Sequence, residues 1–336
     1  MKRWLCLGLL LGALAGPGLR AAEPKTLTVL CYHRFGVETE LDPYKISLQR
    51  LGQQLDWLKD QGYQSVSLAQ VAQAVSQGAG ALPSKALLLS VDDGYKAGAL
   101  GAAEFEKRGF HAVYFVITGT LGKGSYMDWD ACRELERRGH EVASHTLTHE
   151  NLAKPEKGQT PQQYKAWVNQ EFRASRARLE KELGHPVTAM AYPYGAYNPA
   201  VSKAALDAGY TLHFTVSDGV NLSDSLDPQR LRRILFMGHP SQEAFVRRME
   251  KRPVPAAFPA MQDGALFLRS APALDLHGLP ADLKLSVDGQ EVRAFPTDQA
   301  PGFHFLVLDQ GPRETKLLFQ IARDDWAPYF DALTEN

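Results

Sequence analysis

Two short strings in this sequence contain the side chains that could do chemistry. Ser90-Val91-Asp92-Asp93-Gly94 follows directly on an apolar run, and His145-Thr146-Leu147-Thr148-His149 places two imidazoles four residues apart. The first string puts a pair of carboxylates where a buried strand ends, and the second lets two ring nitrogens reach one cation. One Asp and two His make three ligands and leave a coordination position for water, which is typical of a catalytic metal site rather than a structural one. The adjacent, unligated Asp would be free to act as a base on that water.

Each string also has a plainer interpretation. Asp-Asp-Gly is common in surface turns, and two His residues four apart often lie on a solvated helix face. Here, however, both strings occur in one chain, and each follows a strand-like run. That combination favours a metal site over two unrelated surface features.

With these motifs the chain resembles the polysaccharide deacetylases, also called the NodB-homology or carbohydrate esterase family 4 enzymes. S-V-D-D-G is similar to the T-F-D-D-G motif of that family, and H-T-L-T-H matches its H-[ST]-x-x-H motif. Residues 112–117 resemble the strand between these motifs, and residues 191–195 resemble the third motif. The resemblance covers about residues 27–250. Tyr32-His33 make it nearest to the branch that includes the exopolysaccharide deacetylases of biofilm systems.

The resemblance implies a hydrolase that removes N-acetyl groups from an N-acetylglucosamine-containing polysaccharide. It implies that Asp93, His145 and His149 hold one divalent metal ion, with zinc expected and with cobalt, nickel or iron able to use the same ligands. It further implies that Asp92 takes a proton from a metal-bound water. The backbone N–H of Tyr194 would then help to bind the oxyanion, together with the metal.

Three positions depart from the family pattern. Ala191 stands where the third motif usually begins with an Arg that orients the base, and we expect Arg233 to supply that charge from another strand, with Arg232 as the alternative. The fourth motif is not recognisable in residues 217–224. The fifth motif normally provides a His as general acid, but His239 has one residue too many in its string, so the general acid is not assigned.

Two further residues are expected at the substrate. His33 follows the first strand and so shares the mouth of the predicted barrel, as a substrate or metal-shell residue or as a structural His. Tyr192 would line the sugar site or belong to the core.

The order of elements predicts an α/β fold. Strands that are apolar throughout alternate with amphipathic helices, which indicates a parallel sheet covered by helices. The number of units is enough to close a barrel, whose reactive loops lie at the C-terminal ends of its strands. The resemblance implies a distorted (β/α)7-type barrel. The predicted helices lie between Ser47 and Gly62 and over 68–76, 96–108, 129–138, 161–183, 198–208 and 242–250.

The chain divides into four predicted parts. Residues 1–22 indicate a secretory signal peptide, because Lys2 and Arg3 precede a short apolar stretch that falls well short of the ~20 residues a membrane span needs. An uncleaved anchor is the alternative. Residues 23–251 form the deacetylase domain, 252–261 a linker, and 262–336 a small β-sandwich that would bind carbohydrate or serve a packing role. We therefore expect an exported protein, either periplasmic or secreted.

Composition narrows the partners. The chain has 336 residues, 44% of them hydrophobic. Its net charge of −1 gives no basic excess that would indicate nucleic-acid binding. We also expect no membrane span in the mature chain. The expected partners are an acetylated polysaccharide and proteins of exopolysaccharide synthesis or export. The oligomeric state is not indicated. Cys31 and Cys132 could pair, but two buried thiols are favoured.

Two other functions stay open. The same site would serve an O-acetyl esterase or a peptidoglycan deacetylase. A polysaccharide-binding protein with a decayed site would explain the missing third-motif Arg and fifth-motif His. The presence of Asp92 together with all three ligands argues against decay.

Overall fold

The computed structural model describes residues 25–38, 42–237, 239–251, 266–267, 284–292, 302–310, 313–321 and 327–334. The predicted signal peptide and linker lie outside these residues. Within them, no helix is both long enough and apolar enough to cross a membrane.

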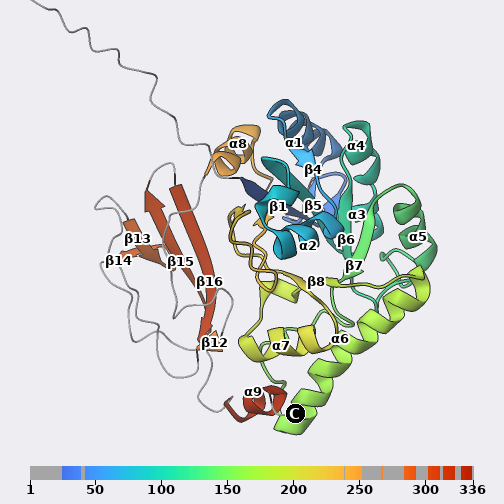
Figure 1. Cartoon of the computed structure of the whole chain (residues 1–336), viewed down its shortest axis with the longest axis vertical. Coiled ribbons are helices and arrows are strands. Elements are labelled where there is room, and N and C mark those ends of the chain that lie inside the picture. Colours follow the sequence, from blue (N-terminus) through green and yellow to red (C-terminus); the bar gives the residue numbers. More distant parts are fainter. Residues whose placement is uncertain are drawn as a thin grey trace, which may run out of the picture.

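A nine-stranded, mainly parallel sheet forms the centre of the molecule (Figure 1). Its main path runs β10-β1-β5-β6-β7-β8-β9, with β11 also paired to β1 and β4 to β5. The strands are β1 Thr26–Tyr32, β4 Gln64–Ser65, β5 Lys85–Asp93, β6 Ala112–Val116, β7 Glu141–Ser144, β8 Ala189–Ala191, β9 Leu212–Phe214, β10 Asn221–Leu222 and β11 Ile234–Leu235. All pairings are parallel except that of β10.

One segment links the two edges of this sheet. Leu231 forms a parallel bridge with Phe214 of β9, and the same segment continues into β11, which pairs with β1. On the inner face, the rings of Phe115 and Phe214 lie 5.2 Å apart, although β6 and β9 are three strands apart in the sheet. The sheet therefore curls into the distorted barrel that the sequence predicts.

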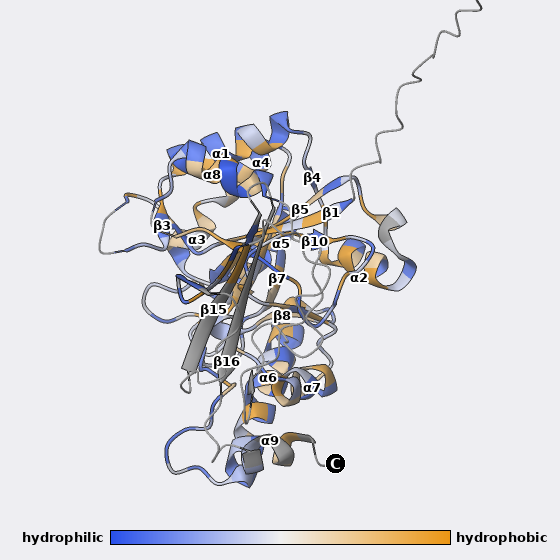
Figure 2. Cartoon of the chain, turned by 90° about the vertical axis from the view of Figure 1, so that its left-hand side faces the viewer, coloured by the Kyte–Doolittle hydropathy of each residue, from blue (hydrophilic) through white to orange (hydrophobic). Residues whose placement is uncertain are grey.

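Helices cover the outer face of the sheet (Figure 1). They are α1 Leu48–Asp60, α3 Lys96–Ala99, α4 Ala102–Lys107, α5 Trp129–Arg137, α6 Pro161–Leu183, α7 Pro199–Asp207 and α8 Gln242–Glu250. The helix α2, Leu68–Gln77, instead packs Val71 and Ala74 against the apolar cluster on the inner side of the sheet. Figure 2 shows apolar residues concentrated in the central strands and polar residues on the outward helix surfaces. The helix predicted over 161–183 is confirmed as α6, which Thr160 begins with a capping box and Gly184 ends in the left-handed conformation.

Alternation along β5 determines which side chains reach the inside of the barrel. Leu87 and Leu89 face the helices, whereas Ala86 and Leu88 face the second apolar cluster on the opposite side. Because side chains of a strand alternate between faces, Asp92 continues the inner row. The buried strand therefore delivers a carboxylate to the mouth of the barrel.

The helix predicted over 96–108 is wrong in one respect, because it is broken into α3 and α4. Two glycines allow a neighbouring strand to approach at the break. A Cβ at Gly98 would lie 2.8 Å from the carbonyl oxygen of His33, and a Cβ at Gly101 would lie 2.4 Å from the Phe35 ring. The approaching strand is β2, Arg34–Phe35, which pairs with β3, Lys45–Ile46.

The C-terminal region contains a separate five-stranded sheet, drawn in red beside the barrel in Figure 1. Its strands are β12 Leu266–Phe267, β13 Lys284–Val287, β14 Gln290–Val292, β15 Gly302–Gln310 and β16 Arg313–Ile321, in the order β12-β16-β15-β13-β14. The Asp288-Gly289 turn joins β13 and β14 as a hairpin, with both residues at positive φ. These strands form a single layer. The described residues of this region therefore show one sheet, whereas the predicted β-sandwich would have two.

The sequence interpretation missed a helix at the end of the chain. This helix, α9 (Ala327–Thr334), packs on α6 and α7 of the barrel. The Tyr329 hydroxyl donates a hydrogen bond to the carbonyl oxygen of Gln159 at 2.8 Å, and its ring meets that of Tyr164. Cys31 and Cys132 are both buried and free.

Candidate active site

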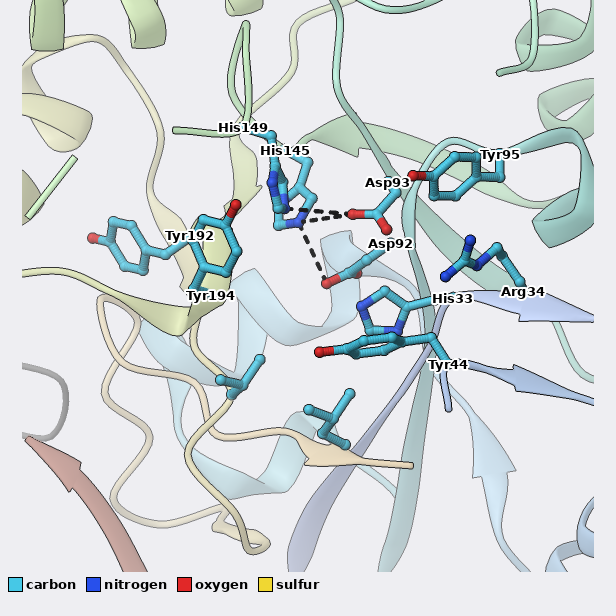
Figure 3. Close-up of a pocket in the computed structure, with 12 residues that line it drawn as sticks. His33, Arg34, Tyr44, Asp92, Asp93, Tyr95, His145, His149, Tyr192 and Tyr194 are labelled. Atoms are coloured by element: carbon cyan, nitrogen blue, oxygen red, sulfur yellow. Dashed lines mark ion pairs between the residues drawn. The ribbon is translucent and has the colours of Figure 1, made fainter. Parts of the chain in front are cut away.

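A pocket of about 370 Å³ opens at the carboxyl ends of the barrel strands (Figure 3). Its walls come from the ends of β1 and β5, the loops after β7 and β8, and the β2–β3 segment. It is lined by His33, Arg34, Tyr44, Asp92, Asp93, Tyr95, His145, His149, Tyr192, Tyr194, Val216 and Leu235. Most of the residues that the sequence singled out therefore share one cavity.

Asp93, His145 and His149 form a group whose ligand atoms all lie within 4.8 Å of one another. The Asp93 Oδ1 atom is 3.6 Å from the Nε2 atom of His145 and 3.5 Å from that of His149. These distances exceed hydrogen-bond length but suit two ligands that each lie ~2.0–2.1 Å from one ion. The Nδ1 atom of His145 lies 2.8 Å from the carbonyl oxygen of Ala191, which leaves Nε2 directed at the group.

The protonation states of this group suit a cation. Burial lowers the pKa of His145 to about 4, and burial together with His145 lowers that of His149 to about 3, so both imidazoles are neutral at pH 7. Burial and the neighbouring Asp92 carboxylate raise the pKa of Asp93 to about 7. Neutral imidazole is the form that binds metal, and a cation beside Asp93 would favour its ionised form.

Asp92 lies beside this group and is held by Arg233. The Arg233 Nη1 atom donates to Asp92 Oδ1 at 2.7 Å, and its Nε atom donates to the carbonyl oxygen of Thr215 at 2.7 Å. Both side chains are fully buried. Burial alone would raise the pKa of Asp92, but Arg233 and His145 outweigh it and hold that pKa well below its usual range. Asp92 is therefore ionised at neutral pH.

Four residues around the pocket have a left-handed backbone. They are Asp93 (φ 74°), Thr146 (φ 63°), His149 (φ 68°) and Tyr194 (φ 58°). For residues other than glycine this conformation costs roughly 1–2 kcal/mol each. Such strain tends to occur where a structure holds side chains for function.

The remaining predicted site residues differ in their exposure. His33 lines the pocket beside Tyr44, and burial lowers its pKa to about 4, so its ring is neutral at pH 7. Tyr192 fits the core alternative better, because it is buried, stacks on Tyr197 and meets the Nδ1 atom of His213 at 2.7 Å through its hydroxyl. Tyr194 is 59% exposed, and the edge-to-face contact of its ring with His149 measures 4.8 Å between centroids.

Sequence reasoning missed one wall of the pocket. Arg34 lies over the ring of Tyr95 at 4.8 Å, and Tyr95 stacks on Tyr126 with 4.5 Å between ring centroids. Tyr44 completes this wall, and Asp42 pairs with Arg34 at 2.8 Å. Tyr95 directly follows the D-D-G string, and this position is the only local sequence feature that could have indicated a pocket residue. The other residues reach the pocket through the β2–β3 pairing, which no motif predicts.

Comparison with known proteins agrees with this geometry. The family model for polysaccharide deacetylases matches residues 79–213, which contain the Asp pair, the His pair and Tyr194. A polysaccharide deacetylase homologue of Bacillus subtilis (strain 168), YxkH, is 27% identical over 208 residues, which cover 61% of this chain and 70% of that protein. The poly-beta-1,6-N-acetyl-D-glucosamine N-deacetylase of Escherichia coli (strain K12) is 25% identical over 245 residues, which cover 59% of this chain and 34% of the relative.

The fold comparison gives the same result. The structure of the Streptococcus pyogenes deacetylase PplD, solved in complex with acetate, superposes with a TM-score of 0.59 at 26% identity. The match covers 68% of this chain and 99% of that one. The family model and the deacetylase relatives, together with this fold and site, indicate a hydrolase of the deacetylase class. Residues 79–213 of this chain therefore contain a polysaccharide deacetylase domain.

Proposed function

We propose that this protein removes N-acetyl groups from an N-acetylglucosamine-containing polysaccharide, with Asp92 as the base. The observation that carries the proposal is the position of Asp92, ionised and held by Arg233, beside the group of Asp93, His145 and His149 in one pocket. The names of relatives such as the Escherichia coli enzyme support a β-1,6-linked polymer as the substrate.

Asp93, His145 and His149 would hold one divalent cation, for which we propose zinc. Two neutral imidazoles and one carboxylate are a donor set that zinc accepts, and three protein ligands leave a position open. When bound, such a cation supplies polarisation of the acetamide carbonyl and lowers the pKa of water. The fixed Nε2 direction of His145 supports its assignment as a ligand.

Asp92 would accept the proton of the attacking water. Its ionised state leaves it able to accept, and Arg233 fixes one of its oxygens so that the other faces the His145 side of the pocket, where Oδ2 lies 3.7 Å from Nε2. Arg233 therefore acts on the base rather than on the substrate.

The turn at Pro193–Gly195 would present the backbone N–H of Tyr194 to the oxyanion. A Cβ at Gly195 would lie 2.4 Å from the Val216 side chain, so the turn is pressed against the next loop. A donor fixed in this way stabilises developing charge without reorganisation.

The wall of Arg34, Tyr44 and Tyr95 supports a carbohydrate substrate. Aromatic faces and a few fixed polar groups are typical of sites that bind small organic ligands. His33 would contribute a neutral hydrogen-bonding imidazole beside Asp92, and Tyr192 would support the opposite side of the pocket from the core (Figure 3).

We also propose that residues 1–22 direct export, to the periplasm or beyond the cell, where such a polymer would be met. Residues 23–251 would then act as the deacetylase domain, with the C-terminal sheet as an accessory unit.

A substrate panel tests the proposal. Acetate release by the full chain would be measured on poly-β-1,6-N-acetylglucosamine, chitin oligomers, peptidoglycan and acetylated xylan, each with and without a chelator. We expect chelator-sensitive release that is fastest on the first polymer. Faster release from xylan would make the protein an O-acetyl esterase, and no release from any substrate by cation-loaded protein would favour a binding role.

A further inference from the structure

Glu171 lies on α6, outside every string that the sequence analysis singled out, and its carboxylate is buried against the loop that follows β7. Its Oε2 atom accepts hydrogen bonds from the backbone N–H groups of Leu147 and Thr148 at 3.0 and 2.9 Å. Its Oε1 atom accepts one from the Thr148 hydroxyl at 2.7 Å. Among the described residues, Glu171 takes part in no ion pair.

A carboxylate suits this position because of the number of hydrogen bonds it can accept. A buried charge without a cation is unfavourable unless strong hydrogen bonds compensate it, and Glu171 receives three. The N–H groups of a buried turn need acceptors. One ionised carboxylate accepts all three bonds through two oxygens, whereas an apolar side chain accepts none.

The loop that Glu171 holds is strained and tightly packed. Thr146 and His149, on either side of the two bonded amides, have φ values of 63° and 68°. From the opposite side, the N–H of Gly119 donates to the carbonyl oxygen of Leu147 at 2.8 Å, and a Cβ at Gly119 would come within 2.4 Å of that oxygen. The loop is therefore fixed between the end of β6 and α6.

The two imidazoles of this loop are held in different ways. The His145 ring is fixed by the carbonyl oxygen of Ala191. The described contacts of the His149 ring are with Asp93 at 3.5 Å and with the rings of His145 and Tyr194, and none is a hydrogen bond to its nitrogens. The direction of the His149 ring therefore depends on the backbone at His149. The preceding residue is Thr148, whose N–H donates a hydrogen bond to Glu171.

We propose that Glu171 is a positioning residue that orients His149 for cation binding. This inference rests on the proposed function, in which His149 is a ligand. Without the carboxylate, the amides of Leu147 and Thr148 would turn toward water and the left-handed backbone at His149 would relax. The His149 ring would then leave the group formed with Asp93 and His145.

The experiment measures cation affinity directly, without turnover. The full chain, stripped of metal, would be titrated with Zn²⁺ and Co²⁺ against a chromophoric chelator, for wild type, Glu171→Ala, Glu171→Gln and Thr148→Val. We expect Glu171→Ala to raise the dissociation constant about 10–100-fold, as is usual for groups that orient a ligand. Glu171→Gln should weaken cation binding less, because its amide oxygen can still accept hydrogen bonds from both N–H groups. The dissociation constant of Thr148→Val should lie between those of Glu171→Gln and wild type.

A variant of the same helix provides the control. Tyr164→Phe removes the buried hydroxyl that donates to the carbonyl oxygen of Leu152 at 2.6 Å, and should lower thermal stability without changing cation affinity. Hydrogen exchange at the amides of Leu147 and Thr148 should speed up in Glu171→Ala and stay slow in Tyr164→Phe.

Three results would overturn the inference. Glu171→Ala could fold and bind cation as wild type does, or Tyr164→Phe could weaken binding equally, which would make Glu171 merely structural. If Glu171→Ala does not fold, unchanged cation affinity in both Glu171→Gln and Thr148→Val would also show that Glu171 does not orient His149. If wild type binds no cation, the proposed function fails, and the exchange rates of the two amides still decide whether Glu171 holds the loop.

Discussion

The ionisation of Asp92 depends on two opposing effects. Its complete burial favours the neutral acid, while the guanidinium of Arg233 and the His145 ring favour the carboxylate and prevail. Arg233 is itself fully buried, so each charge needs the other. Removal of one partner from a buried pair typically costs 3–5 kcal/mol, because the remaining charge is uncompensated.

Arg233→Gln should therefore raise the pKa of Asp92. A base with a higher pKa is protonated over a wider acidic range, so the acidic limb of the pH profile of kcat/KM should move to higher pH. At neutral pH we expect a loss of about 10²-fold, the scale of general-base catalysis. The measurement is the pH profile of acetate release by wild type and variant.

Arg233→Lys provides the matched comparison, because it keeps the charge and loses the fork that reaches both Asp92 and Thr215. It should shift the acidic limb less than Gln does. An acidic limb that stays in place in both variants would show that Arg233 does not set the ionisation of Asp92.

At the residue scale, the sequence predicted which side chains would meet, but only one of the residues that hold them. The Asp pair and the His pair lie at strand ends, and a parallel barrel brings such ends together. Arg233 was expected from the absence of an Arg at position 191. Glu171 and Tyr126 had no signal, because their contacts arise only when α6 and the segment after β6 are packed in place.

Among the elements, the β2–β3 segment forms the pocket wall that the sequence did not predict, and it is tied to α1. Glu38 accepts hydrogen bonds from the Arg50 guanidinium at 2.7 and 3.0 Å and from the N–H of Ser47 at 2.8 Å. Arg50 also donates to the carbonyl oxygen of Pro240 at 2.7 Å. These contacts fix the segment that carries Arg34 and Tyr44.

Glu38→Gln should lower thermal stability in a pH-dependent way. The hydrogen bonds from Arg50 lower the pKa of Glu38 from 4.5 to about 2. A lowered folded-state pKa stabilises the protein above pH 4.5, and that contribution is lost as the pH falls toward 2. The difference in Tm between wild type and variant should therefore be largest near pH 7 and shrink below pH 4.5.

Asp56→Asn is a suitable control, because Asp56 pairs with Arg108 at the surface, far along α1 from the pocket wall. The Glu38→Gln variant should also raise KM for a polymer substrate, whereas Asp56→Asn should not. Equal Tm differences for Glu38→Gln at pH 3 and pH 7 would contradict the assignment of the pKa shift.

Element boundaries were predictable where local chemistry decides them. A capping box and a left-handed Gly define both ends of α6, and Ser241 caps α8 where the sequence indicates. The break between α3 and α4 was not predictable, because Gly98 and Gly101 are needed by the approach of β2, which is a tertiary contact.

In the whole molecule, the end of the chain returns to the barrel. The helix α9 follows the C-terminal sheet yet packs on α6 and α7, with Ala332 and Leu333 buried. Because α6 also carries Glu171, this contact supports the helix that holds the His loop. The sequence contains no recognisable linker between the preceding strands and α9, so α9 was not predicted.

Leu333→Ala should destabilise the barrel by about 2–5 kcal/mol, the usual cost of a large-to-small change in a packed interior. Pro328→Ala, at an exposed position of the same helix, should change stability by no more than ~1 kcal/mol. Chemical denaturation followed by tryptophan fluorescence would measure both. Equal, small effects would show that α9 does not support the barrel.

The central claim is that Asp92 is the base of a cation-dependent deacetylase, and one comparison tests it most directly. Acetate release from poly-β-1,6-N-acetylglucosamine would be measured for wild type and Asp92→Asn, with bound cation quantified in both. We predict that Asp92→Asn is less stable, because Arg233 loses its counter-charge, but still folds and keeps its cation, and that its rate falls at least about 10²-fold. Acetate release by a cation-loaded Asp92→Asn at the wild-type rate would contradict the account.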